Sequence, residues 1–257
     1  MNFKTSTTAA ILLFITCLLT QAFAAQSAEN IYQLAVNNEE RSAADIARDS
    51  QRKPAEVLAF LGIAPGMVVL DLFSGGGYYT ELLARIVGPD GFVTGHSNLA
   101  YLGFSGEEST ARYKDNRLPN TSILMAENNE LMLVADTYDA VTMILAYHDI
   151  YYADADIGWA KIDGPALLAE LYKGMKPGAV LGIVDHAAAQ GSPSTTGGTT
   201  HRIDRDLVVS EVEAAGFVLD GESDVLRNAD DDYDKSVFDA DVRGKTDRFV
   251  LKFRKPD

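Results

Sequence analysis

The stretch that most constrains the fold of this chain runs from Val68 to Thr80. It reads Val-Val-Leu-Asp-Leu-Phe-Ser-Gly-Gly-Gly-Tyr-Tyr-Thr, an apolar run that ends in an acid and is followed by three glycines. Apolar residues then recur at Tyr79, Leu82, Leu83 and Ile86, which is the period of a helix packed against a sheet. The stretch therefore predicts a strand, a tight turn and a helix.

The predicted turn favours a nucleotide-like ligand. Glycine lets the backbone bend sharply and approach a bound molecule, and the free N–H groups that open a helix favour polar or anionic groups. A dinucleotide fingerprint would read G-x-G-x-x-G, but Gly75 and Gly77 are followed by Thr80 where the third glycine would stand. NAD is therefore the weaker candidate. A structural turn of another doubly wound protein, without a ligand, is the alternative.

Helical and extended patterns alternate regularly along the rest of the chain. We expect strands at 67–72, 92–96, 121–126, 138–146 and 179–185, helices at 78–87, 106–115, 164–174 and 205–215, and two late strands at 217–226 and 247–254. Such alternation is typical of a mostly parallel sheet with helices on both faces. No internal repeat or linker divides residues 54–257, which we therefore expect to form one α/β domain.

Several motifs resemble the class I S-adenosylmethionine (SAM) methyltransferases. Asp71 followed by Gly75 and Gly77 is similar to motif I of that superfamily, with Phe73 in place of its first glycine. Residues 137–141 and 174–181 are similar to later parts of the same pattern, so the resemblance covers about residues 54–184. It implies a three-layer, doubly wound, mostly parallel seven-stranded sheet (a Rossmann-like methyltransferase fold) with an antiparallel C-terminal strand, and SAM as the cofactor.

Shorter motifs look like an exported bacterial branch of predicted methyltransferases. These are Arg48-Asp49, Tyr147-His148-Asp149, Asp185-His186 and His201-Arg202-Ile203-Asp204. Members of that branch resemble this chain nearly from end to end. The resemblance carries the fold with more safety than the substrate.

The expected cofactor contacts follow from the resemblance and from the rule that ligands of doubly wound sheets lie at the carboxyl ends of the strands. The ribose window at residues 94–98 holds no acid, so Ser97 and Asn98 would bond the hydroxyls as neutral groups. Glu127 and Asn128 stand where a polar side chain meets the adenine amino group, or they simply form the turn after the strand. The predicted cofactor-binding residues are Asp71, Gly75, Gly76, Gly77, Tyr78, Ser97, Asn98, Glu127 and Asn128.

Three of the four histidines fall near the ends of neighbouring strands. The predicted catalytic residues are His148, Asp149, Asp185, His186 and His201. A histidine with a nearby carboxylate can act as a base near neutral pH, which is the role we assign. Two interpretations stay open beside it: a divalent metal bound by His148, Asp185 or His186, and His201, or hydrogen bonding that only holds the loops. We assign no metal site, and we interpret the glycine-rich loop 187–200 as a candidate lid.

The N-terminus predicts export. Lys4 precedes an apolar run over 9–19, and Ala22-Phe23-Ala24 then forms a cleavage pattern, so residues 1–24 are predicted to be a signal peptide cut after Ala24. The run is too short to span a bilayer, so no membrane insertion is expected after cleavage. Residues 25–53 form a predicted helical extension, whose charged residues either stabilise a solvated helix or make a lid with arginines that reach a ligand carboxylate.

Charge and cysteine content narrow the partners. Cys17 is the only cysteine and lies in the predicted signal peptide, which excludes disulfides, thiolate nucleophiles and cysteine–zinc sites from the mature chain. The mature chain has 21 basic and 37 acidic residues, a net charge of −16 that repels nucleic acid and anionic lipid. A small-molecule substrate is therefore expected. The acidic run 228–234 lacks the glycine and terminal glutamate of a calcium loop, and we expect a solvated turn.

These observations together predict SAM-dependent methyl transfer to a small acceptor in the periplasm. SAM is made in the cytoplasm, so export leaves an alternative: a periplasmic metal- or metabolite-binding protein on a methyltransferase scaffold that transfers no methyl group. A metal-dependent hydrolase or lyase on the same scaffold is a third hypothesis.

Overall fold

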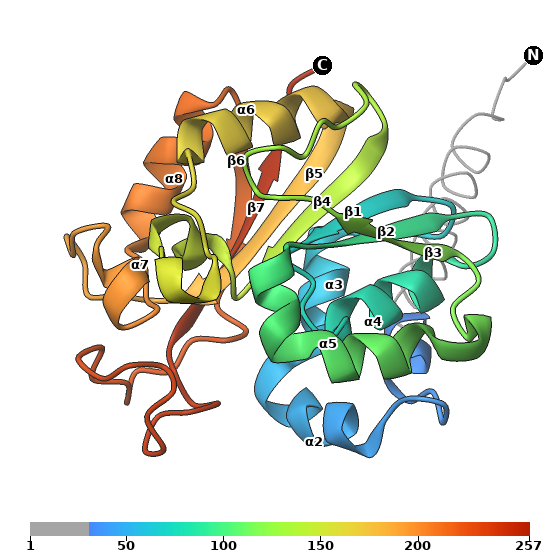
Figure 1. The fold of residues 1–257 in the computed structure, drawn as a ribbon, viewed down its shortest axis with the longest axis horizontal. Helices are drawn as coiled ribbons and strands as arrows, with labels where there is room; N and C mark the ends of the chain where they lie inside the picture. The colour runs from blue at the N-terminus through green and yellow to red at the C-terminus, as the bar shows by residue number, and fades with distance from the viewer. Residues whose placement is uncertain (1–30) are drawn as a thin grey trace, which may run out of the picture.

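The computed structural model describes residues 31–257 and has a seven-stranded sheet at its centre (Figure 1). The strands are β1 (Val68–Leu72), β2 (Phe92–Ser97), β3 (Thr121–Met125), β4 (Tyr138–Ile144), β5 (Met175–His186), β6 (Val218–Ser223) and β7 (Arg248–Arg254). Their order is β3-β2-β1-β4-β5-β7-β6. The first five strands pair in parallel, whereas β7 is antiparallel to both β5 and β6. The predicted fold class is confirmed, including the antiparallel strand at the C-terminus.

Helices cover both faces of the sheet. They are α2 (Ala43–Arg52), α3 (Pro54–Leu61), α4 (Tyr78–Val87), α5 (Leu99–Tyr113), α6 (Gly164–Gly174), α7 (Thr196–Thr199) and α8 (Arg205–Ala214), with short 3₁₀ turns η1 (Lys114–Asn116), η2 (Tyr147–Tyr151) and η3 (Ala155–Ile157). The helices α6 and α8 pack on one face, and α3 and α4 pack on the other (Figure 1). The described residues include no helix with the length and apolar character needed to cross a bilayer.

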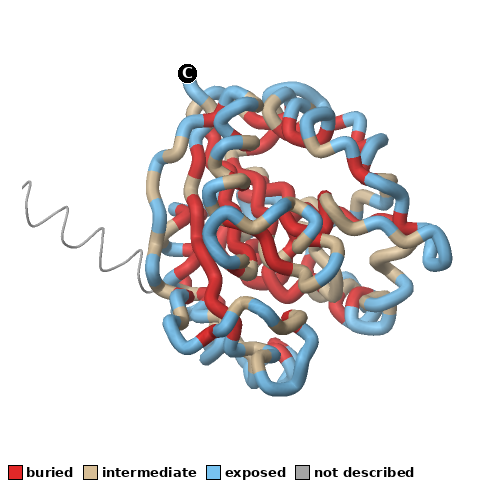
Figure 2. Tube along the Cα trace, turned by 90° about the vertical axis from the view of Figure 1, so that its left-hand side faces the viewer, coloured by how far each residue is buried: buried red, intermediate tan, exposed pale blue. Residues whose placement is uncertain are grey.

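Two apolar cores lie on the two faces of the sheet because successive strand residues point in opposite directions. Leu70 and Leu72 of β1 pack with α6 and α8, whereas Val69, which precedes Leu70, packs with α3 and α4. The buried part of the chain is gathered at the middle of the molecule (Figure 2). Both faces of the central strands are therefore buried, as is usual for a parallel sheet.

One helix differs from its prediction. We expected a helix at 106–115, but α5 begins at Leu99. Asn98 caps it, since its side-chain oxygen accepts a hydrogen bond from the Tyr101 N–H at 2.7 Å. The extra turns bring Tyr101 toward the predicted glycine turn. Residues 99–105 have no apolar period from which a longer helix could be predicted.

The C-terminal segment between β6 and β7 is fixed by a buried ion pair. The guanidinium of Arg202 is fully buried and bonds both carboxylate oxygens of Asp231 at 2.7 and 2.9 Å. Asp231 also accepts the N–H of Asp247 at 2.6 Å. The predicted solvated turn at 228–234 is thus wrong for Asp231, although Asp232 and Asp234 are exposed. The pair joins this segment to the loop that carries His201.

The N-terminal segment is joined to the sheet by polar contacts. In α2, Asp49 bonds the guanidinium of Arg41 and accepts the Tyr78 hydroxyl at 2.5 Å. Asp45 is buried and pairs with Arg112 of α5 at 2.8 Å. The charged residues of α2 therefore contact α4 and α5. The predicted signal peptide lies outside the described residues.

The strand order places the main crevice. β1 lies between β2 and β4, and the chain leaves β1 toward one side of the sheet and β4 toward the other. In doubly wound folds the carboxyl ends of two such strands border the ligand-binding crevice.

Candidate active site

The turn after β1 has the conformation that its glycines allow. Gly75 and Gly77 have φ angles of 56° and 78°, in the left-handed region where a side chain is strained. The Gly77 N–H donates to the Ser74 carbonyl at 2.9 Å, and α4 begins at the next residue, Tyr78. The sequence therefore predicts this strand, turn and helix at the correct positions.

Asp71 fixes the base of the turn. Its carboxylate is buried and accepts hydrogen bonds from the hydroxyls of Thr80 at 2.6 Å and Thr142 at 2.9 Å. Burial raises the pKa of the Asp71 carboxyl to about 6, although these hydrogen bonds oppose the shift. Asp71 thus joins β1 to α4 and to β4, and it lies at the back of the crevice.

The helix α5 packs directly on the glycine turn. A Cβ atom at Gly76 would lie 2.0 Å from the Glu108 carboxylate, and one at Gly77 would lie 2.6 Å from the Arg112 side chain. The absence of a side chain at these two glycines therefore makes room for Glu108 and Arg112 of α5. At Gly75 the nearest atom to such a Cβ is Tyr101 Cε1, at 3.0 Å.

Phe73 belongs to an aromatic cluster beside the turn. Its ring stacks on Trp159 at a centroid distance of 6.4 Å, and Tyr101 lies 5.4 Å from Trp159. His96 meets Phe73 edge-on, and its Nδ1 accepts the Phe73 N–H at 3.4 Å. The other ring nitrogen, Nε2, therefore carries the proton and donates to the Ala126 carbonyl at 3.0 Å. His96, to which the sequence assigned no role, connects the turn to the end of β3.

The predicted ribose and adenine contacts lie at the carboxyl ends of β2 and β3. Asn98 and Ser97 are buried, and the Asn98 side chain caps α5. Glu127 is half-buried, and Asn128 is buried with its Oδ1 accepting no hydrogen bond from the described residues. Asn128 therefore offers an acceptor that a ligand could satisfy.

The predicted histidine and aspartate residues come together at the carboxyl ends of β4 and β5. His148 Nδ1 lies 2.7 Å from Asp185 Oδ1, and the His148 backbone N–H donates to Asp185 Oδ2 at 2.8 Å. The carboxylate of Asp149 lies 3.4 Å from His148 Nε2 and 3.7 Å from His201 Nδ1. His186 is turned aside, with its Nδ1 2.7 Å from the Thr246 hydroxyl.

The two central histidines differ in protonation. Burial by itself lowers the pKa of His148, but the carboxylates of Asp185 and Asp149 raise it to about 9. Burial lowers the pKa of His186 well below its ordinary value, and the charges of His148 and Arg248 lower it further. These opposite pKa shifts favour a charged His148 beside a neutral His186 near neutral pH.

One cavity of about 1080 Å³ joins the glycine turn to the histidine cluster. Ligand pockets commonly measure about 300–1,000 Å³, so this cavity can hold a ligand of cofactor size. Of the predicted residues, it is lined by Asp71, Gly75, Gly76 and Tyr78 at one end and by His148, Asp149, His186 and His201 at the other. Asp185 lies behind His148, and Gly77, Ser97, Asn98, Glu127 and Asn128 do not line it.

Four arginines that are not among the predicted site residues also line this cavity: Arg48, Arg52, Arg243 and Arg248. Arg48 pairs with Asp45 and Glu108. Among residues 31–257, no carboxylate lies within ion-pair distance of Arg52 or Arg248, although Arg248 is only 6% exposed. Burial lowers the pKa of Arg248, and the nearby charge of Arg52 adds to the lowering. The pairing of His186 with Arg248 across β5 and β7 explains why Arg248 reaches the cavity.

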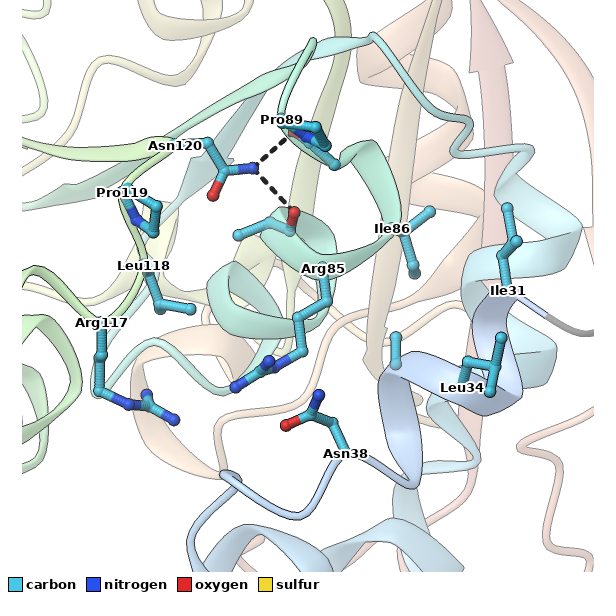
Figure 3. A pocket seen from close by; sticks show the side chains of 13 residues that line it. Ile31, Leu34, Asn38, Arg85, Ile86, Pro89, Arg117, Leu118, Pro119 and Asn120 are labelled. Atoms are coloured by element: carbon cyan, nitrogen blue, oxygen red, sulfur yellow. Dashed lines mark hydrogen bonds between the residues drawn. The ribbon is translucent and has the colours of Figure 1, made fainter.

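A second cavity, of about 460 Å³, lies at the opposite end of β1 and β2 (Figure 3). It lies between residues 31–38, the end of α4 and the segment before β3. Asn120 donates there to the carbonyls of Ala84 and Gly88, both at 2.8 Å. None of the predicted site residues lines this second cavity.

Comparison with known proteins agrees with this geometry. A family model described as protein-L-isoaspartate(D-aspartate) O-methyltransferase matches residues 22–153. No curated protein matches the sequence significantly.

Solved structures share the fold. A SAM-dependent methyltransferase from Aquifex aeolicus is 21% identical, with a TM-score of 0.56, over 81% of this chain and 98% of the other. A SAM-dependent methyltransferase from Mesorhizobium loti is 14% identical, with a TM-score of 0.56, over 80% and 99%. The cyclase SpnF is 17% identical, with a TM-score of 0.54, over 86% and 85%. At these identities the likeness shows the fold.

The His96 ring makes stability depend on pH. Burial lowers the pKa of His96 to about 4 from 6.5. The unfolded chain therefore binds more protons between these values, so the contribution of His96 is complete above pH 6.5 and is lost as the pH falls toward 4. We expect wild type to lose about 2–3 kcal/mol more unfolding free energy than His96→Gln between pH 7 and pH 4.5. Urea unfolding of both proteins at each pH measures the difference, and parallel pH curves would refute it.

Proposed function

This chain belongs to the protein-L-isoaspartate(D-aspartate) O-methyltransferase family, and we propose that it methylates a small anionic acceptor in the periplasm. The supporting observation is the single cavity that connects the glycine turn, the uncompensated arginines and the histidine cluster. A methyl donor held at one end would face an acceptor held at the other. The cavity beside Asn120 contains none of these groups.

SAM is the cofactor of this methyltransferase, as the family and the fold establish. Two features of the structure fit it. The cavity reaches the turn at Gly75 and Gly76. Asn128 lies outside the cavity, but its buried Oδ1 lacks a donor among the described residues, which an adenine amino group would supply if the bound cofactor extends past the cavity wall. When bound, SAM supplies an electrophilic methyl group on a sulfonium centre.

The residues of the chain would mainly align and desolvate the reactants. Methyl transfer depends chiefly on bringing the two reacting atoms together in line. Phe73, Tyr101 and Trp159 form an apolar wall of the cavity that keeps water from the reacting atoms. An anionic oxygen is already deprotonated, so the reaction does not require a histidine base. The acid–base role of His148 and Asp185 stays a prediction.

The arginines indicate the class of acceptor. A buried guanidinium without a carboxylate partner is costly unless a ligand supplies the opposite charge. Within the described chain, Arg248 is buried and bonds only the backbone carbonyls of Thr246 and Gly244, and the half-buried Arg52 faces the same cavity. Guanidinium groups bind carboxylate and phosphate in a bidentate manner. We therefore assign the acceptor a carboxylate or phosphate group.

The proposed location rests on the N-terminal sequence, which lies outside the described residues. The charged residue, apolar run and small-residue pattern of residues 1–24 support export. The chain would then belong to the exported branch that it resembles. Residues 25–53 would form a lid over residues 54–257.

Binding of S-adenosylhomocysteine tests the cofactor site. We expect one site per chain by calorimetry, and we expect Asn128→Leu to bind about 5- to 30-fold more weakly because it loses one hydrogen bond to adenine. Removal of an unpartnered oxygen should leave the melting temperature unchanged or higher. Glu130→Gln, which changes an exposed side chain two residues on, is the control and should bind like wild type. No binding by the folded wild-type protein would refute the cofactor site.

Substitution of Arg52 tests the acceptor class. Carboxylate and phosphate metabolites are first screened for formation of S-adenosylhomocysteine. With the active acceptor, Arg52→Met should raise KM at least 10-fold through loss of a charge-assisted hydrogen bond, while Arg52→Lys raises it less. Affinity for S-adenosylhomocysteine should not change. An uncharged acceptor whose KM is the same in both variants would contradict the anionic class.

Cell fractionation tests the location. The full chain, expressed with its own N-terminus in a Gram-negative host, should appear in the osmotic-shock fraction with Ala25 as its first residue. Full-length protein that stays in the cytoplasm would contradict export.

A further inference from the structure

Three side chains at the inner end of the main cavity converge on one point. They are His148 and Asp149 of η2 and His201 from the loop after α7, and their ligating atoms all lie within 4.8 Å of one another. We propose that His148 Nε2, Asp149 Oδ1 and His201 Nδ1 bind one divalent transition-metal ion, of which zinc suits the ligands best. Two imidazoles and one carboxylate are a common ligand set for such ions.

The distances favour metal ligation over hydrogen bonding. Charged hydrogen bonds measure about 2.7–2.9 Å, as His148 Nδ1 and Asp185 Oδ1 do at 2.7 Å. The Asp149 oxygen lies farther from its two histidines, at 3.4 and 3.7 Å. Two atoms that each lie about 2.0–2.1 Å from a tetrahedral zinc ion are about 3.4 Å apart. The separations therefore leave room for an ion between these atoms.

The Asp149 carboxylate lacks another partner. The residue is 6% exposed, faces the cavity, and accepts no hydrogen bond from residues 31–257. A buried carboxylate without hydrogen bonds is costly, whereas a metal ion satisfies it. This observation is independent of the spacing of the three residues.

The surroundings of the cluster are built like the outer shell of a metal site. Asp185 is fully buried and bonds both the His148 ring and its backbone N–H, so it fixes the ring with Nε2 toward Asp149. Carboxylates of this kind commonly orient metal-bound histidines. His201 has a φ of 54°, rare for a residue with a side chain, and the buried Arg202–Asp231 pair holds the next residue.

Three protein ligands leave a coordination position open toward the cavity, where an acceptor oxygen or a water molecule can bind. The use of this position by the acceptor rests on the proposed function, whereas the metal site itself does not. A metal ion here and Arg248, which pairs with His186 across β5 and β7, would bind an anionic acceptor at two points.

Titration with zinc alone tests the site. The mature chain, purified without a histidine tag and stripped with a chelator, should bind one Zn²⁺ per chain. We expect His201→Gln and Asp149→Asn each to weaken binding at least 10-fold, and Asp185→Asn to weaken it 10- to 100-fold. His186→Gln is the matched control, since that ring bonds Thr246, and it should bind like wild type. No saturable binding, or equal binding by wild type and His201→Gln, would overturn the proposal.

A measurement on the wild-type protein avoids variants that do not fold. Loaded with Co²⁺, the chain should show two strongly shifted ring N–H signals in its NMR spectrum, one from each ligating histidine, and the absence of such signals would overturn the site. S-adenosylhomocysteine binding is measured on the same sample. A protein that binds S-adenosylhomocysteine but does not bind zinc would overturn the metal site and keep the proposed function. A protein that binds zinc but does not bind S-adenosylhomocysteine would keep the metal site and overturn the proposed function.

Discussion

The reversal of strand order between β1 and β4 is the constraint on which the rest of the structure depends. Because the chain leaves these neighbouring strands toward opposite sides, no crossover covers their carboxyl ends. The buried carboxylate of Asp71 holds the two strands and α4 together at this point through Thr80 and Thr142. The glycine turn at Gly75 and Gly76 and the histidines His148, His186 and His201 border the opening that results.

The crevice is divided into two unlike parts. On the β4 and β5 side it is an open cavity with arginines, histidines and aspartates. On the β2 and β3 side, Phe73, Tyr101 and Trp159 pack against one another, and α5 lies on the turn at Gly76 and Gly77. This aromatic wall includes Phe73, which stands where motif I of the methyltransferases has its first glycine.

Local signals predicted the parts of the fold that depend on local chemistry. The glycine turn, the alternation of strands and helices, and the grouping of His148, Asp185 and His201 at one sheet edge all follow from residue pattern and topology. Contacts between distant segments were missed. Asn98 is predicted only as a ribose contact. Its capping of α5 could not be predicted, because the first turns of that helix have no apolar period. Nothing in the sequence showed that Trp159 would stack on Phe73, or that Asp231 would be buried against Arg202.

The central claim is that the cofactor and the histidine cluster share one cavity. A crystal structure of the protein with S-adenosylhomocysteine tests this most directly. The account predicts the amino-acid end of the ligand against Gly75 and Gly76, with its sulfur facing the cavity that His148 and Arg52 line. Ligand density in the cavity beside Asn38 and Asn120, or on the outer side of α5, would contradict it.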